Sequence, residues 1–106
     1  MTEKYVQINI GRGTTTPKGE PYDMDLTTWR EFIQSTVDAL EGSTRGEFPN
    51  LTVHSGDGVW NDRCEQSAHI STVADVDTYA LRTKLSTLKS EYNQEAIALI
   101  VGSDLI

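Results

Sequence analysis

The stretch Leu51–Thr72, LTVHSGDGVWNDRCEQSAHIST, predicts how the chain folds. Two segments of alternating apolar and polar residues flank Asn61–Asp62, a pair favoured in tight turns. A β-hairpin turning between these two residues places His54 opposite His69, with Cβ atoms about 5 Å apart. A slip of one residue would turn the aliphatic side chains of the hairpin to the other face, so we expect that face to pack under helices. The aliphatic set is Leu51, Val53, Val59, Ala68 and Ile70.

Two further strands lie near the ends of the sequence. Residues 5–10, YVQINI, alternate apolar and polar side chains, which is typical of a half-buried strand. The closing run AIALIVGSDLI, residues 96–106, is more continuously apolar and is typical of a strand with little exposure. Residues 11–25 are rich in glycine, proline and threonine and predict a long loop.

Helical spacing of apolar residues predicts two helices. The first begins after Asp25 as N-cap and ends at Gly42. The second begins after Asp75 or Asp77 and ends at Asn93, a residue that tolerates the left-handed conformation. The apolar stripe of the first helix is Leu26, Trp29, Phe32, Ile33, Val37 and Leu40, and that of the second is Leu81, Leu85, Leu88 and Tyr92.

The predicted order β-α-β-β-α-β is the split βαβ, or ferredoxin-like, arrangement of the α+β class. Right-handed crossovers put both helices on one face of a four-stranded antiparallel sheet, in the spatial order 4-1-3-2. Another small α+β sandwich with the same elements paired differently is the alternative. The length of 106 residues indicates a single domain over 1–106.

Composition excludes several classes of function. The formal net charge is −7, with 16 acidic and 9 basic residues, which argues against nucleic acid as a partner. The first residues do not follow the pattern of a signal peptide, and no apolar run approaches the roughly 20 residues of a membrane helix. A single cysteine, Cys64, gives no internal disulfide. We therefore expect a cytoplasmic protein with no membrane partner, no cofactor and no metal.

The sheet face without helices is the predicted binding surface. It carries amides, imidazoles and aromatic surface, and Gly56 and Gly58 leave room beside them. The loop GRGTTT, residues 11–16, offers amides, hydroxyls and a guanidinium to a phosphate and leaves the sheet close to this face, so it could close as a lid. We expect a nucleotide-like small molecule, with a second copy of the chain covering the sheet as a homo-oligomer. The candidate ligand-binding residues are Gln7, Asn9, Arg12, His54, Trp60, Arg63, Ser67 and His69.

Catalysis is the less favoured use of this face. The string HIST, residues 69–72, resembles the His-x-Ser/Thr signature of two-histidine phosphoesterases, which implies that His54 and His69 would act as base and acid. If the protein is an enzyme, these two residues are the candidates. A zinc site with Glu65 is disfavoured, because four residues of strand separate Glu65 from His69 by about 13 Å. Binding without turnover is the preferred hypothesis.

The strings YVQINIGR, SAHIS and AIALIVGSDLI, in a short acidic chain, resemble small proteins of uncharacterised function encoded by bacteriophages. This resemblance implies a role against host defence in the cytoplasm of the host cell. The first hypothesis is sequestration of a nucleotide-derived second messenger of host immunity. The second is an acidic inhibitor that binds a host defence protein, and the third is the two-histidine phosphodiesterase.

Overall fold

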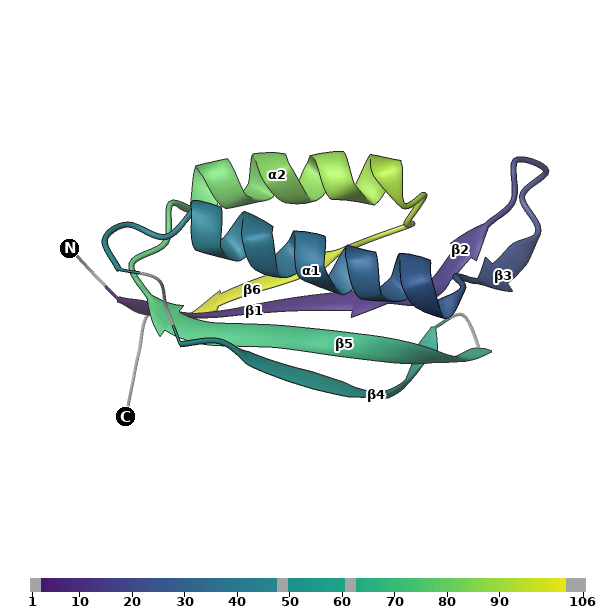
Figure 1. The fold of residues 1–106 in the computed structure, drawn as a ribbon, viewed down its shortest axis with the longest axis horizontal. Coiled ribbons are helices and arrows are strands. Elements are labelled where there is room, and N and C mark those ends of the chain that lie inside the picture. Colours follow the sequence, from purple (N-terminus) through teal and green to yellow (C-terminus); the bar gives the residue numbers. More distant parts are fainter. Residues whose placement is uncertain (1–2, 48–49, 61–62, 103–106) are drawn as a thin grey trace.

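A sheet covered on one face by two helices forms the body of the protein (Figure 1). The computed structural model describes residues 3–47, 50–60 and 63–102. The elements are β1 (Lys4–Gly11), β2 (Gly13–Thr15), β3 (Pro21–Asp23), α1 (Leu26–Gly42), β4 (Thr52–Trp60), β5 (Arg63–Ala74), α2 (Thr78–Glu91) and β6 (Ala98–Gly102).

The main sheet has four strands in the order β4-β5-β1-β6, and each neighbouring pair is antiparallel. This is the predicted order 4-1-3-2, and the α+β fold with both helices on one face is confirmed. The arrangement is compatible with a ferredoxin-like fold. Both crossovers pass over the same face because right-twisted strands return to the sheet in one hand only.

The register of the β4–β5 hairpin is also confirmed. His54 pairs with His69, Val53 with Ile70 and Gly56 with Ser67. The turn at Asn61–Asp62, from which this register was predicted, lies outside the described residues. In the described part of the hairpin, the register is therefore explained by the pattern of aliphatic residues along the two strands.

The core lies between the sheet and the helices. In β1, Val6, Ile8 and Ile10 are between 0% and 2% exposed, so every second side chain of the strand faces the helices. Trp29 and Phe32 of α1 contact each other edge to face, with ring centroids 6.2 Å apart. The remaining core side chains include Leu40, Ala68, Ile70, Leu81, Leu85 and Leu88.

Two predictions of burial are wrong. Strand β6 was expected to have little exposure, but Ile100 is 47% and Val101 is 36% exposed. The second concerns the hairpin. Ala68 and Ile70 are fully buried, but Val53 is 46% exposed and Val59 is 74% exposed. Strand β4 is the edge of the sheet, and in Figure 1 it lies farthest from the helices. The two helices cover the central strands of this sheet. The face of β4 on the helix side of the sheet is therefore left without a covering layer.

The predicted loop over 11–25 contains a small hairpin instead. Gly13 pairs with Asp23 and Thr15 with Pro21, forming a two-stranded sheet. Threonine is β-branched and favours extended backbone, and Gly19 supplies the positive φ of 83° near the tip. The hairpin projects from the end of β1 beyond the helices (Figure 1).

Within the described residues, no helix combines the length and the apolar character needed to cross a membrane.

Candidate functional site

The helix-free face of the sheet carries a row of hydrogen-bonding side chains. The alternation in β1 that buries Ile8 places Tyr5, Gln7 and Asn9 on this face. The Tyr5 hydroxyl donates to Gln7 Oε1, and Gln7 Nε2 donates to Asn9 Oδ1 at 2.8 Å. Asn9 is also the strand partner of His69 on β5. Hydrogen bonds within the row therefore fix the positions of these side chains relative to one another.

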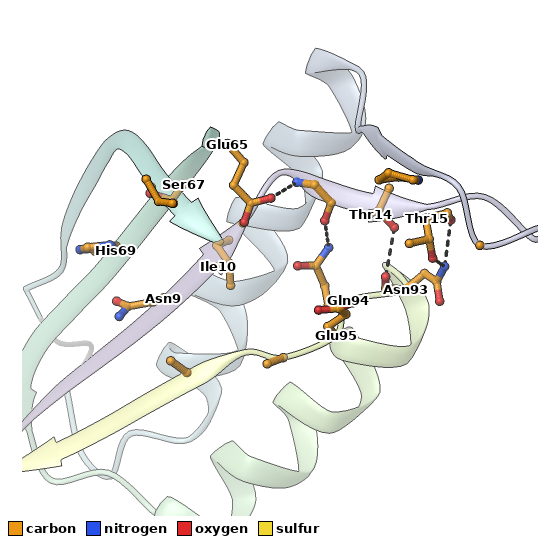
Figure 2. A pocket seen from close by; sticks show the side chains of 18 residues that line it. Asn9, Ile10, Thr14, Thr15, Glu65, Ser67, His69, Asn93, Gln94 and Glu95 are labelled. Carbon is orange, nitrogen blue, oxygen red and sulfur yellow. Dashed lines mark hydrogen bonds between the residues drawn. The ribbon is translucent and has the colours of Figure 1, made fainter. Parts of the chain in front are cut away.

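A cavity of about 550 Å³ lies where this row reaches the end of β1 (Figure 2). Its walls come from β1, the β2–β3 hairpin, β4, β5 and the connection from α2 to β6. Asn9, Ser67 and His69 from the predicted face line it together with Glu65. The cavity therefore joins the predicted surface to segments that are distant in the sequence.

Glu65 lies directly against the backbone where β1 passes into β2. The Gly13 amide donates to Glu65 Oε2 at 3.0 Å (Figure 2). A Cβ atom added at Gly11 or at Gly13 would overlap the carboxylate oxygens of Glu65. Because the two glycines have no side chains, the carboxylate can approach the backbone this closely. It is held there, in the cavity wall, by the Gly13 amide.

The opposite wall is the connection after α2, tied to the hairpin by hydrogen bonds. Asn93, with a positive φ of 50°, donates through Nδ2 to the Thr15 carbonyl at 2.9 Å. Gln94 Nε2 donates to the Gly13 carbonyl at 2.9 Å, and Thr14 Oγ1 donates to the Tyr92 carbonyl at 2.9 Å. Figure 2 shows the contacts of Asn93 and Gln94 beside a second hydrogen bond from Thr14 Oγ1, to the Asn93 carbonyl at 3.1 Å. Residues 11–16, the segment predicted as a lid, therefore form a wall of the cavity. Hydrogen bonds hold this wall to Glu65 on one side and to Asn93 and Gln94 on the other.

The charge of the described lining is acidic. Glu65 and Glu95 contribute carboxylates and His69 an imidazole, and the described residues that line the cavity include no lysine or arginine. The nearby Arg12 guanidinium donates from Nε to the Met24 carbonyl at 2.6 Å and from NH1 to Gln66 Oε1 at 2.8 Å. These two hydrogen bonds hold the segment before α1 beside strand β5. Arg12 does not line the cavity.

The structure brings together part of the predicted site. Asn9, Ser67 and His69 line the cavity, while Gln7 and His54 lie beside them on the same face. The side chains of Trp60 and Arg63 lie outside the described residues. No cluster of three or more metal-ligating side chains is found among the residues that the structure describes.

Sequence reasoning missed the residues contributed by the α2–β6 connection and the role of Glu65. Asn93 was predicted only as the end of a helix, and Gln94 and Glu95 were not considered. The glycine pair Gly11 and Gly13 was a usable signal, since two glycines at the end of a strand indicate that another group approaches the backbone.

Comparison with solved structures gives structural neighbours, whereas comparison by sequence gives none. No family model matches the chain, and no curated protein matches it. A solved structure of a phage SAM lyase in complex with S-methyl-5′-thioadenosine is similar, with a TM-score of 0.47 and 13% sequence identity. The match covers 95% of this chain and 81% of that chain. The function of the present chain is therefore inferred from its own residues.

Proposed function

We propose that the protein is a phage-type binding protein that captures a small nucleoside-derived molecule in the cavity beside His69 and sequesters it without turnover. The single observation that carries this proposal is the cavity of about 550 Å³ with its hydrogen-bonding lining. Sites for small ligands are typically about 300–1,000 Å³. The proposal places the protein in the cytoplasm of the host cell, where such a ligand would be withdrawn from a host defence system.

The lining suits the parts of a nucleoside. The Glu65 carboxylate accepts one hydrogen bond from Gly13 and has capacity for more, which suits the paired hydroxyls of a ribose. Asn9 and His69 can each donate and accept, as the edge of a base requires. The lining also contains apolar surface from Ala96 and Ala98 against which a base can lie.

The acidic lining disfavours a phosphate. The Glu65 carboxylate in the lining repels a phosphate dianion, and Arg12, the guanidinium expected to bind it, is engaged elsewhere. A neutral or cationic substituent on the nucleoside avoids this repulsion. We therefore propose an unphosphorylated nucleoside derivative in place of the phosphate-bearing nucleotide expected from the sequence.

Binding without turnover is supported by the engagement of Ser67. Its hydroxyl donates to the Gly56 carbonyl at 3.4 Å, and among the described residues no hydrogen bond joins it to an imidazole or a carboxylate that could act as a base. His54 and His69 are strand partners, but His54 does not line the cavity of the single chain. The two-histidine phosphodiesterase is therefore an outcome of the test below and not the preferred function.

The experiment is a calorimetric titration with three adenosine derivatives that differ at the 5′ position. S-adenosylmethionine carries a sulfonium cation, S-methyl-5′-thioadenosine is neutral and AMP carries a phosphate. We expect the cationic and neutral ligands to bind at least about tenfold more tightly than AMP, a difference of about 1.4 kcal/mol. Glu65→Gln should reduce the preference for the cation, while Glu31→Gln, an exposed residue of α1, serves as control.

The ligand is then released by heat denaturation and identified by mass spectrometry. Intact ligand supports sequestration, and altered ligand shows that the protein is an enzyme. Tighter binding of AMP or of a cyclic dinucleotide would contradict the role given to the acidic lining. No uptake of any nucleoside derivative would leave the acidic inhibitor of a host protein as the better hypothesis.

A further inference from the structure

Strand β4 has an unprotected outer edge. It is the terminal strand in the order β4-β5-β1-β6, and nine residues long. Thr52–Val59 contains no proline, lysine or arginine, the residues that commonly prevent edge strands from pairing with another chain. Its backbone amides and carbonyls on the outer side are therefore available for a further strand.

Two exposed valines lie on this strand, on the side that faces the helix layer. Val53 is 46% exposed and Val59 is 74% exposed. Val53 points to the same face as its buried strand partner Ile70. Val59, six residues further along the strand, points to that face too. Apolar side chains of this size are stabilised by removal from water, at roughly 25 cal/mol for each Å² buried.

We propose that two copies of the chain pair antiparallel through β4, about a two-fold axis that passes through Gly56. The axis stands perpendicular to the sheet, because only this direction makes equivalent edges antiparallel. Val53 then lies opposite Val59 of the partner subunit, and Ser55 lies opposite Asp57 of the partner subunit. The result is a continuous eight-stranded sheet with the helices of both copies on one face.

The side chains of β4 select this register over its neighbours. Residues that pair across two antiparallel strands must point to the same face of the sheet. The two-fold axis can therefore pass through a residue of β4 but not between two residues. An axis through Ser55 would place Val53 against Asp57 of the partner subunit. An axis through Asp57 would place the two carboxylates directly against each other, which is destabilising. The axis through Gly56 pairs valine with valine and separates the carboxylates.

This pairing also changes the cavity, a consequence that rests on the proposed function. The same register places His54 of the partner subunit opposite Gly58, a residue that lines the cavity and has no side chain of its own. The second copy would thus add an imidazole at the cavity rim. His54, which lies outside the cavity of its own chain, would serve the site of its partner.

The first test measures the oligomeric state by sedimentation equilibrium. Wild-type protein should be a dimer, and Val59→Lys should weaken the association at least tenfold, because it buries a charge against Val53 of the partner subunit. Val73→Lys is the matched control, since Val73 is 42% exposed but lies on the inner strand β5. A monomeric wild type, or equal loss of association in both variants, overturns the proposal.

The second test measures the register by disulfide formation in a Cys64→Ser background. Gly56→Cys should cross-link two copies under mild oxidation, since residues that face each other across an antiparallel pair have Cα atoms within the roughly 4.4–6.8 Å that a disulfide spans. A Cβ at Gly56 meets no atom within 4 Å, so the substitution fits the single chain. Faster cross-linking of Ser55→Cys or Asp57→Cys would overturn this register.

The two proposals fail separately. A monomer that still binds a nucleoside derivative removes the dimer and leaves the proposed function. A dimer that binds none of the three ligands removes the function and leaves the dimer. In a dimer that binds them, His54→Ala should lower the affinity severalfold at dimeric concentrations, and unchanged affinity would overturn the placement of His54 at the partner's cavity.

Discussion

At the scale of single residues, the contact between Glu65 and two glycines defines one wall of the cavity. The carboxylate lies where the Cβ atoms of Gly11 and Gly13 would be, and the Gly13 amide donates to it. Neither glycine has a positive φ. They are required because of close approach, and any other residue would displace a carboxylate that we propose as a ligand contact.

Gly13→Ala is predicted to destabilise the protein by up to about 1 kcal/mol, because the end of the flexible Glu65 side chain must move away and gives up its hydrogen bond from the Gly13 amide. Gly56→Ala is the control. Its Cβ would meet nothing within 4 Å, so we expect little change or a gain of up to about 1 kcal/mol. Urea unfolding measures both.

The double variant Gly13→Ala with Glu65→Ala tests the cause. Removing the carboxylate relieves the overlap, so the double variant should be more stable than the sum of the two single effects indicates. Additive effects would show that Gly13 is constrained by something other than Glu65.

At the scale of elements, the β2–β3 hairpin and the connection after α2 support each other. The contacts of Asn93 with Thr15 and of Gln94 with Gly13 join segments about eighty residues apart in the sequence. A three-residue strand pair has few hydrogen bonds of its own and is marginal in isolation. The hairpin is therefore stabilised by the same contacts that close the cavity.

The N-cap of α1 gives a pH-dependent prediction. The Thr28 amide donates to Asp25 Oδ1 at 2.7 Å, and this bond holds the pKa of the Asp25 carboxyl below its ordinary value of 3.8. A carboxyl whose pKa is lower in the folded state stabilises it at pH values above the unfolded pKa. This contribution is lost as the pH falls through the lowered value.

The measurement is the melting temperature of the wild type and of Asp25→Asn between neutral pH and pH values below the ordinary value of 3.8. Asparagine caps a helix without titrating, so the advantage of the wild type should shrink as the pH falls. A difference that is constant with pH would show that the Asp25 charge does not contribute to the cap.

At the scale of the whole molecule, the acidic charge opposes the proposed pairing of two copies. Each chain has a formal net charge of −7, while the proposed contact is made by valine, serine, glycine, His54 and one carboxylate, Asp57. Association would therefore combine a short-range apolar and hydrogen-bonded contact with long-range repulsion.

Salt is predicted to strengthen the dimer. The screening length falls from about 10 Å at 0.1 M to about 3 Å at 1 M ionic strength, which weakens the repulsion between the two chains. Sedimentation equilibrium at low and high sodium chloride should give a dissociation constant that decreases with salt. A dimer that dissociates on adding salt would indicate that ion pairs hold it together, contrary to the register centred on Gly56.

The sequence by itself determined the elements of the sheet, their order and the pairing of His54 with His69. These follow from local patterns, because alternation along a strand fixes which face a side chain occupies. Tertiary structure alone decided which of the correctly oriented side chains are covered. Val53 has a core direction and remains exposed because the helix layer does not reach the edge strand.

The cavity likewise depended on tertiary structure. Asn9, Ser67 and His69 were found from alternation, whereas Asn93 and Gln94 come from a connection whose position no local pattern encodes. The direction of Arg12 was decided in the same way, by acceptors on β5 and at the start of α1. Local patterns give the direction of a side chain relative to its own element, but the partner it meets depends on how distant elements pack.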